Sequence, residues 1–252
     1  MLATNIIEIK NLYKKYKNAD EFSVNNISLE IGENEIYGIL GPNGAGKTTL
    51  ISMLCGLIKP TSGSYTINGL SPRNRLNSIK KITGIVPQEY ALYPTLTAKE
   101  NLMFFGSLYG LKHAYLHQKI DEMLERVGLT NFANKKIEHF SGGMKRRCNL
   151  IAGIMHNPKV LFLDEPTVGV DVQSRNVIIE FLKELNQNGT SIVYTSHHLQ
   201  EAEEFCTKIA IIDNGQIYAI GSPEELIAKT PKAENLEDVF ISLTGKELRD
   251  VI

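Results

Sequence analysis

The sequence predicts an α/β fold in which a mostly helical stretch interrupts the strands. Short apolar runs with β-branched residues alternate with longer segments of helical pattern. Between about residues 87 and 158 the helical pattern dominates, and strand patterns return after it. A chain of 252 residues is long enough for one large core with an inserted subdomain. One interrupted core therefore explains the order of elements better than two tandem domains.

The individual elements follow from these patterns in chain order. Strands are expected where a short apolar run stands alone, at residues 6–12, 24–31, 36–40, 64–67, 82–86, 160–163, 191–195, 208–212 and 216–220. Helices are expected where the pattern is longer, at residues 47–57, 98–109, 115–127 and 142–156. The strand at 36–40 runs directly into a glycine-rich turn and then into the first of these helices.

Composition excludes several classes of protein. The 27 basic and 28 acidic side chains give a net charge of −1, so no overall charge attracts the chain to nucleic acid or anionic lipid. Cys55, Cys148 and Cys206 form no CxxC pair and are expected to be reduced, buried thiols. The N-terminal residues lack the pattern of a secretion signal, and no apolar stretch reaches the ~18 residues that a membrane span needs. We therefore expect an intracellular protein that does not cross a membrane by itself.

A phosphate-binding loop is the first motif that carries chemistry. The segment from Gly41 to Thr48 satisfies GxxxxGK[ST] and lies between a predicted strand and a predicted helix. Glycines let the backbone N–H groups turn toward phosphate, and the helix adds its positive end. Lys47 is expected to reach the β- and γ-phosphates, and the Thr48 hydroxyl to coordinate Mg²⁺. The predicted nucleotide-binding residues here are Gly41, Pro42, Asn43, Gly44, Ala45, Gly46, Lys47, Thr48 and Thr49.

Two carboxylates end a second buried strand. Asp164 and Glu165 follow the apolar run at 160–163, and the carboxyl end of a parallel strand is where an α/β sheet holds its ligand. Asp164 is expected to hold Mg²⁺ through water, and Glu165 to polarise the water that attacks the γ-phosphate. The plainer alternative is a strand that ends in two acids before Pro166. Because 134–137 does not match the base-reading NKxD motif of GTPases, and a kinase needs no water-activating Glu, hydrolysis is favoured.

A third motif identifies a family. The residues Ser141, Gly142 and Gly143 at a helix start provide a hydroxyl, N–H groups and a positive dipole end, which together suit an anion. With its flanks Phe140 and Met144-Lys-Arg-Arg147, this segment resembles the signature of the nucleotide-binding subunits of ATP-binding cassette (ABC) transporters. The resemblance implies that the signature completes the ATP site of a partner subunit, so that two ATP molecules lie between two head-to-tail cassettes.

The resemblance also implies a fold and its parts. It implies a P-loop NTPase core with an N-terminal antiparallel β subdomain and an inserted α-helical subdomain. The expected parts are the core with its β subdomain at 1–87 plus 159–225, the helical insertion at 88–158 and a helical tail at 226–252. The signature has Phe140 where Leu is commoner and Met144 where Gln is commoner. Met144 followed by basic residues, and the tail at 235–245, resemble the drug- and antibiotic-exporting branch.

The remaining family positions occur in the family's order. Tyr16 resembles the aromatic that stacks on adenine, with Tyr13 as the alternative. Gln88 resembles the Q-loop residue that contacts Mg²⁺ and the attacking water. Asp171 resembles the D-loop acid, although it also suits an N-cap for the next helix. His197 resembles the switch histidine that contacts the γ-phosphate.

These motifs predict the ATPase subunit of an ABC exporter, with ATP and Mg²⁺ as cofactors. The resemblance implies Glu165, His197 and Gln88 as catalytic residues, and Thr48, Gln88 and Asp164 at the metal. It also implies a second copy or a homologous subunit as partner, a separate transmembrane permease, and a cytoplasmic position on the inner face of the membrane. No nucleic acid partner is expected. The alternative is a soluble ABC ATPase that acts as a mechanical switch on nucleic acid or the ribosome.

Overall fold

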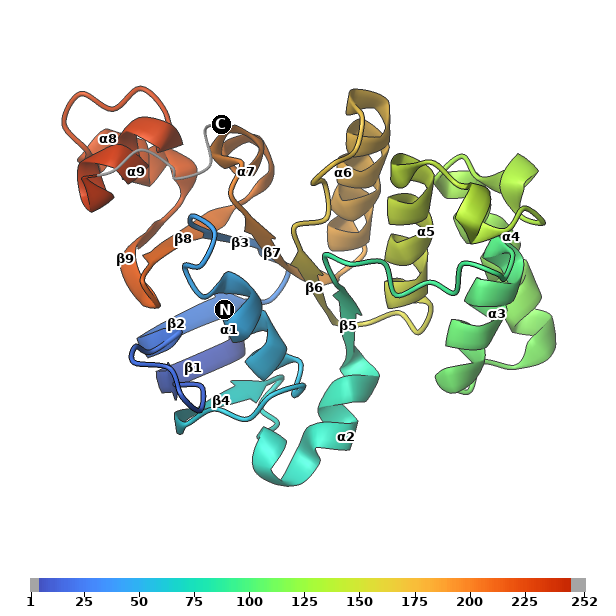
Figure 1. The fold of residues 1–252 in the computed structure, drawn as a ribbon, viewed down its shortest axis with the longest axis horizontal. Helices are drawn as coiled ribbons and strands as arrows, with labels where there is room; N and C mark the ends of the chain where they lie inside the picture. The colour runs from blue at the N-terminus through green and yellow to red at the C-terminus, as the bar shows by residue number, and fades with distance from the viewer. Residues whose placement is uncertain (1–4, 246–252) are drawn as a thin grey trace. The chain divides into compact units, whose positions relative to one another are not determined.

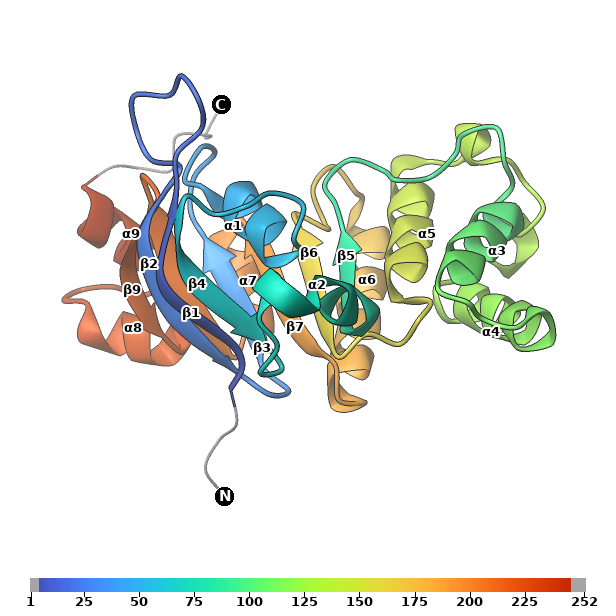
Figure 2. The same ribbon diagram turned by 90° about the horizontal axis from the view of Figure 1, so that it is seen from below.

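The structure is a computed structural model that describes residues 5–245 (Figures 1 and 2). Residues 246–252 of the predicted tail lie outside the described residues. The chain divides into two compact units. The first unit runs to Lys80 and resumes at Ser191, and the second unit comprises residues 81–190.

A three-stranded antiparallel sheet opens the first unit, as predicted. Its strands lie side by side in the order β2-β1-β4 (Figures 1 and 2). They are β1 (Asn5–Lys14), β2 (Val24–Gly32) and β4 (Ser62–Ile67). In β2, Ile27, Leu29 and Ile31 alternate with more exposed residues, the pattern of a sheet that buries one face.

The phosphate loop belongs to a second group of strands in the same unit. Here β3 (Ile36–Leu40) lies between β7 (Ser191–Ser196) and β8 (Lys208–Asp213), and all three are parallel. The last strand, β9 (Gln216–Gly221), runs antiparallel to β8. Every residue of β3 is buried, as expected for a central strand between two parallel neighbours. Its carboxyl end leads into the loop and then into α1 (Lys47–Leu54).

The second unit holds one parallel strand pair and four α-helices. β5 (Thr83–Val86) pairs with β6 (Val160–Asp164). The helices are α3 (Ala98–Leu108), α4 (His113–Arg126), α5 (Gly142–Ile154) and α6 (Val172–Gln187), with short 3-10 turns η1 (Thr130–Phe132) and η2 (Ile137–His139). A Cβ on Gly84 of β5 would lie 2.4 Å from the carbonyl oxygen of Gly153 in α5. Glycine at this point therefore lets α5 pack closely on the strand that leads to Gln88.

The predicted helix ranges omit α6, for which only the N-cap Asp171 is predicted, and also omit two further helices. Some predicted ends are misplaced as well. α2 (Pro72–Ile82) carries mostly polar side chains, buries only Ile79, and is interrupted by a non-helical Arg75, so its helical pattern is weak. α7 (Leu199–Phe205) is short. α1 ends at Leu54 rather than Leu57, because the chain turns at Gly56 with a φ of +69°.

The C-terminal part contains α8 (Pro223–Lys229) and α9 (Leu236–Thr244). The observed unit boundaries differ from the predicted insertion at 88–158, because β5, β6 and α6 group with the helices. The division of the chain into a nucleotide-binding core, a helical insertion and a tail remains a prediction. Across residues 5–245, no helix is long and apolar enough to cross a membrane.

Candidate functional site

The phosphate loop has a backbone that side chains larger than glycine would disturb. Gly46 is the N-cap of α1 and has a φ of +102°, and Gly44 has a φ of +83°. A Cβ on Gly46 would lie 2.1 Å from the Ser23 carbonyl oxygen, and one on Gly41 would lie 2.1 Å from the Ile212 carbonyl oxygen. The loop therefore packs against its own unit on two sides and needs glycine at both contacts.

Lys47 and the first turn of α1 give this loop its positive charge. The Lys47 ammonium donates hydrogen bonds to the carbonyl oxygens of Gly41 and Pro42, at 2.7 and 3.1 Å. Only 5% of the surface of Lys47 is exposed. The first turn of α1 contains no acidic residue, so the charge of Lys47 and the helix end act together on an anion.

Tyr16, the predicted adenine contact, lies near the phosphate loop within the first unit. The Tyr16 hydroxyl and the Thr49 Oγ1 are 3.4 Å apart, which brings an exposed aromatic ring to the helix that follows the loop. The alternative, Tyr13, packs edge-to-face on Phe22 with ring centroids 5.7 Å apart. Tyr16 is the more exposed of the two rings, and the Lys14 ammonium lies over it, 5.2 Å from its centroid. Exposure therefore favours Tyr16 over Tyr13 as the ring that meets a base.

His197 follows the end of β7, the strand beside β3. Leu40 and Ser196 are register partners, and the Gly41 N–H donates to the Ser196 carbonyl oxygen at 3.4 Å. The residue after Ser196 consequently starts at the same sheet end as the phosphate loop. The His197 and His198 rings are 4.2 Å apart, and His198 is the N-cap of α7.

The second unit brings Gln88 and Glu165 together. The Gln88 Nε2 donates to the Glu165 Oε2 at 2.9 Å. Asp164 and Glu165 are both 5% exposed, so two neighbouring carboxylates are buried at the end of β6. Glu165 has a φ of +49°, whereas most of the described non-glycine residues with positive φ are asparagine. A backbone held in this costly conformation fixes the direction in which the Glu165 side chain leaves the chain.

The predicted signature begins a helix in the same unit. Ser141 is the N-cap of α5, and its hydroxyl accepts a hydrogen bond from the Met144 N–H at 3.3 Å. Ser141 and Gly142 are exposed, while Gly143 is buried against the next motif. A Cβ on Gly143 would lie 2.1 Å from the Ser174 Oγ, so only glycine fits there.

Asp171 has the N-cap role that the sequence allowed. Its two carboxylate oxygens accept from the Ser174 N–H at 2.9 Å and the Ser174 Oγ at 2.8 Å. These hydrogen bonds lower the pKa of the Asp171 carboxyl below its ordinary value. Because Ser174 also lies against Gly143, the cap of α6 and the start of α5 are packed together.

Comparison with known proteins agrees with this arrangement. A family profile described as "ABC transporter" matches residues 24–168. The chain is 49% identical over 224 residues to the linearmycin resistance ATP-binding protein LnrL of Bacillus subtilis, which covers 89% of this chain and 71% of that protein. It is 34% identical over 304 residues to the Nod factor export ATP-binding protein I of Cupriavidus pinatubonensis, covering 98% and 93%.

Solved structures show the same fold. An ATP-binding subunit of an ABC transporter superposes with a TM-score of 0.86 at 26% identity, covering 95% of this chain and 99% of that one. A dimeric ATP-binding cassette in a post-hydrolysis state with ADP and Pi has a TM-score of 0.79 at 28% identity, covering 86% and 98%. The chain belongs to the ABC transporter family. It is an ATP-binding ATPase of that family, as the motifs predicted.

In this ABC ATPase, three polar residues important for the site's architecture were not foreseen from the sequence. Arg146 and Asn149 of α5 bind the backbone on both sides of Gln88. Asn101 is fully buried, and its amide contacts the backbone of Tyr93 and Thr97. Their spacing in a helix is ordinary, so no local sequence signal distinguishes them from exposed polar residues.

The donor set fits a magnesium ion in composition. Within residues 5–245, no three His, Cys, Asp or Glu side chains cluster in a way that could hold a metal. Mg²⁺ in phosphoryl transfer typically takes one or two protein oxygens together with phosphate oxygens and water. The buried Asp164 carboxylate, the exposed Thr48 hydroxyl and the Gln88 amide are ligands of that kind.

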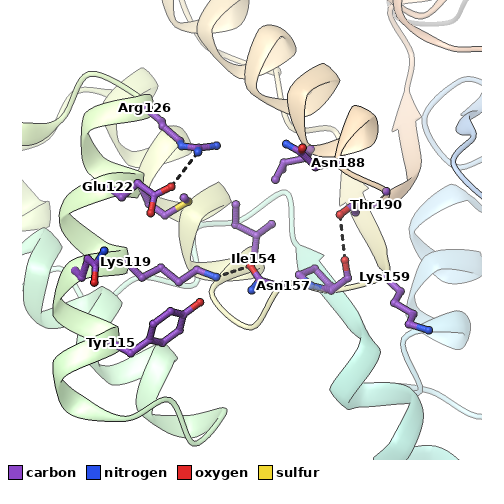
Figure 3. Close-up of a pocket in the computed structure, with 14 residues that line it drawn as sticks. Tyr115, Lys119, Glu122, Arg126, Ile154, Asn157, Lys159, Asn188 and Thr190 are labelled. Carbon is purple, nitrogen blue, oxygen red and sulfur yellow. Dashed lines mark hydrogen bonds and ion pairs between the residues drawn. The ribbon is translucent and has the colours of Figure 1, made fainter.

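A polar cavity of about 460 Å³ in the second unit contains none of the predicted site residues (Figure 3). Lys119 of α4 points into it and bonds to Asn157, while Arg126 reaches Glu122 at 2.9 Å. Burial lowers the pKa of Lys119. Lys119 and Arg126 thus both have oxygen partners among the residues that line the cavity. His113 and His117, 4.5 Å apart on α4, likewise have no cluster of metal-ligating partners in the described chain.

Proposed function

We propose that this chain hydrolyses ATP in a dimer of cassettes and thereby drives a separate membrane permease of an export system. The observation that carries the proposal is the 2.9 Å hydrogen bond between Gln88 Nε2 and Glu165 Oε2. It brings together the two side chains that would sense the permease and activate water.

ATP binding is assigned to the first unit. The N–H groups of the loop from Gly41 to Thr48 would surround the phosphates, and Lys47 would exchange its two carbonyl partners for the β- and γ-phosphates. Tyr16 would stack on adenine, because its ring is exposed beside Thr49. His197 would contact the γ-phosphate from the end of β7.

The second copy of the chain supplies the missing anion site. Ser141 and Gly142 are exposed at the positive end of α5, a helix of thirteen residues. A single chain binding one ATP has no use for two γ-phosphate sites, so Ser141 of the partner subunit would close over the nucleotide. Asp171 would connect the two sites at this interface. Loss of the γ-phosphate charge would then let the two copies separate.

Thr48, Asp164 and Gln88 would hold Mg²⁺, which supplies charge neutralisation of the phosphate oxygens when bound. Glu165 would accept a proton from the attacking water through the carboxylate oxygen that Gln88 now contacts. The positive φ of Glu165 fixes the direction in which its Cβ leaves the backbone, and the hydrogen bond from Gln88 holds the carboxylate. Little reorganisation would then be needed during the reaction.

Export is supported by the relatives and by the signature. The similar proteins named for linearmycin resistance and Nod factor export match most of this chain. Met144-Lys-Arg-Arg147 and the tail at 235–245 resemble the same branch. A permease helix would dock near Gln88 and the helices of the second unit, and the ATPase would then lie on the inner face of the membrane.

Purification of the tagged chain from gently solubilised membranes tests the partner. Co-elution with a protein that spans the membrane several times is expected, whereas co-elution with ribosomes contradicts transport. The variant K47A tests the loop separately, because it should weaken MgATP binding at least about tenfold by removing a charge-assisted contact. Normal MgATP affinity in K47A would show that the loop assignment is wrong.

A further inference from the structure

We infer that Arg146 is a positioning residue that keeps the side chains of Gln88 and Glu165 in hydrogen-bond contact with each other. The inference rests on the proposed function, since it concerns how the two catalytic side chains are kept in contact. Arg146 lies in α5, one turn after the signature, and only 4% of its surface is exposed. It therefore faces inward, unlike the exposed start of the same helix.

The guanidinium of Arg146 contacts both segments that carry the catalytic groups. Its Nη1 donates to the carbonyl oxygens of Gln88 at 2.8 Å and Pro87 at 3.2 Å. Its Nη2 donates to the Val168 carbonyl oxygen at 3.5 Å. The Val168 N–H in turn donates to the Glu165 carbonyl oxygen at 3.3 Å. One side chain thus connects the backbone of Gln88 with the turn that begins at Glu165.

The planar shape of the guanidinium makes this connection possible. Two nitrogens point in fixed directions toward two different loops, which an ammonium on a flexible stem cannot reproduce. The Tyr90 ring lies under the group, with its centroid 4.9 Å from Cζ, and restricts it from the other side. The Tyr90 hydroxyl also donates to the Gly142 carbonyl oxygen at 3.3 Å, so the stacking ring is itself fixed to the signature.

Asn149, one turn further along α5, strengthens the hold on the Gln88 segment. Its Oδ1 accepts from the Ala91 N–H at 3.1 Å, and its Nδ2 donates to the Pro87 carbonyl oxygen at 3.4 Å. Arg146 and Asn149 lie three residues apart and share one face of the helix. The Gln88 segment is consequently attached to α5 at both ends, and motion of α5 would be transmitted to Gln88.

The positive charge of Arg146 also suits its position near the carboxylates of Asp164 and Glu165. Asp164 and Glu165 attract the Arg146 cation, while burial lowers its pKa. The buried pair of carboxylates thus has a buried cation that approaches from the signature helix. A neutral side chain at position 146 would remove this charge compensation and could not reproduce the two-nitrogen geometry of the guanidinium.

The experiment compares R146K and R146Q with R126K in the full chain. Arg126 is the matched control, because it is an arginine of the same unit whose partners are the exposed carboxylates of Glu122 and Glu184. We expect R146K to lower kcat about 10- to 100-fold, since misplacing a catalytic group by about 1 Å can cost that much, with the MgATP Kd within about threefold of wild type. R126K should keep both constants within about twofold.

A double-mutant cycle with Q88A distinguishes positioning from a general structural role. Q88A already removes the contact between Gln88 and Glu165. If Arg146 acts by maintaining that contact, the kcat of the double variant should lie within about threefold of the lower single variant. Losses that multiply would overturn the inference, as would an R146K kcat within twofold of wild type. If neither Arg146 variant folds, N149A must lower kcat with unchanged MgATP affinity, and an unchanged kcat overturns it. A wild-type kcat in E165Q would instead overturn the proposed function, so the two failures are distinct.

Discussion

Alanine in place of Gly46 tests how the phosphate loop is built. Gly46 and Gly44 both have positive φ, +102° and +83°, but their surroundings differ. A Cβ on Gly46 would lie 2.1 Å from the Ser23 carbonyl oxygen, whereas a Cβ on Gly44 would find no heavy atom within 4 Å. G44A therefore changes only the backbone preference, while G46A adds a collision with backbone.

The expected magnitudes follow from these two terms. A non-glycine residue in the left-handed region costs about 1–2 kcal/mol, which is the whole expected effect of G44A. Displacing packed backbone costs about 1–3 kcal/mol more, which gives G46A a total of about 2–5 kcal/mol. At about 2–4 °C per kcal/mol for a chain near this size, G44A should lower Tm by about 2–8 °C and G46A by about 4–20 °C.

Thermal unfolding with and without MgATP measures both stability and binding. Saturation at 100 times Kd stabilises the wild type by about 2.7 kcal/mol, and G46A should lose most of this gain because its loop is displaced. G44A should keep more of it. Equal loss of Tm in the two variants would refute the steric argument at Gly46, and so would a G46A protein as stable and as well protected by MgATP as the wild type.

Three further predictions concern other parts of the site. Hydrogen bonds from Ser174 lower the pKa of Asp171 in the folded state below its ordinary value of 3.8. At pH values above the unfolded-state pKa, the wild type should therefore be more stable than D171N. This difference in stability should disappear as the pH falls through the lowered, folded-state pKa. A margin in urea unfolding that stays constant from pH 7 to 3 contradicts this. N101L should lower the free energy of unfolding in urea by about 1–3 kcal/mol, because it leaves the buried backbone groups of Tyr93 and Thr97 without the Asn101 amide. A decrease below about 0.5 kcal/mol would contradict this prediction. Y16A should weaken MgATP binding about 5- to 30-fold in calorimetry, because it loses about 1–2 kcal/mol of stacking. Y13A should keep its MgATP affinity within about twofold of wild type. The reverse result would assign the adenine contact to Tyr13.

The strands and the phosphate loop could be predicted because their signals are local. β3 matches the predicted range, since a fully buried parallel strand is a continuous apolar run. α2 could not be predicted in the same way, because it buries only Ile79 and contains a non-helical Arg75. Its helical form depends on contacts that a polar sequence does not reveal.

The candidate site likewise combines residues whose roles the sequence reveals with residues whose roles it does not reveal. Gly44 and Gly46 are recognisable because the motif requires their backbone conformations. The roles of Arg146 and Asn149 depend on the carbonyl oxygens of Pro87 and Gln88, far away in sequence, so nothing near α5 predicts them. The positive φ of Glu165 is equally hidden, because glutamate has no preference for that conformation.

The most direct test of the whole account is the variant E165Q, which keeps the shape of the side chain and removes its basicity. ATP turnover and the mass of the protein in MgATP should be measured on the same preparation, by phosphate release and by light scattering after size exclusion. The account predicts retained ATP binding, a loss of turnover of at least about 100-fold, and a stable dimer that holds ATP. Turnover within twofold of wild type, or a monomer in saturating MgATP, would contradict it.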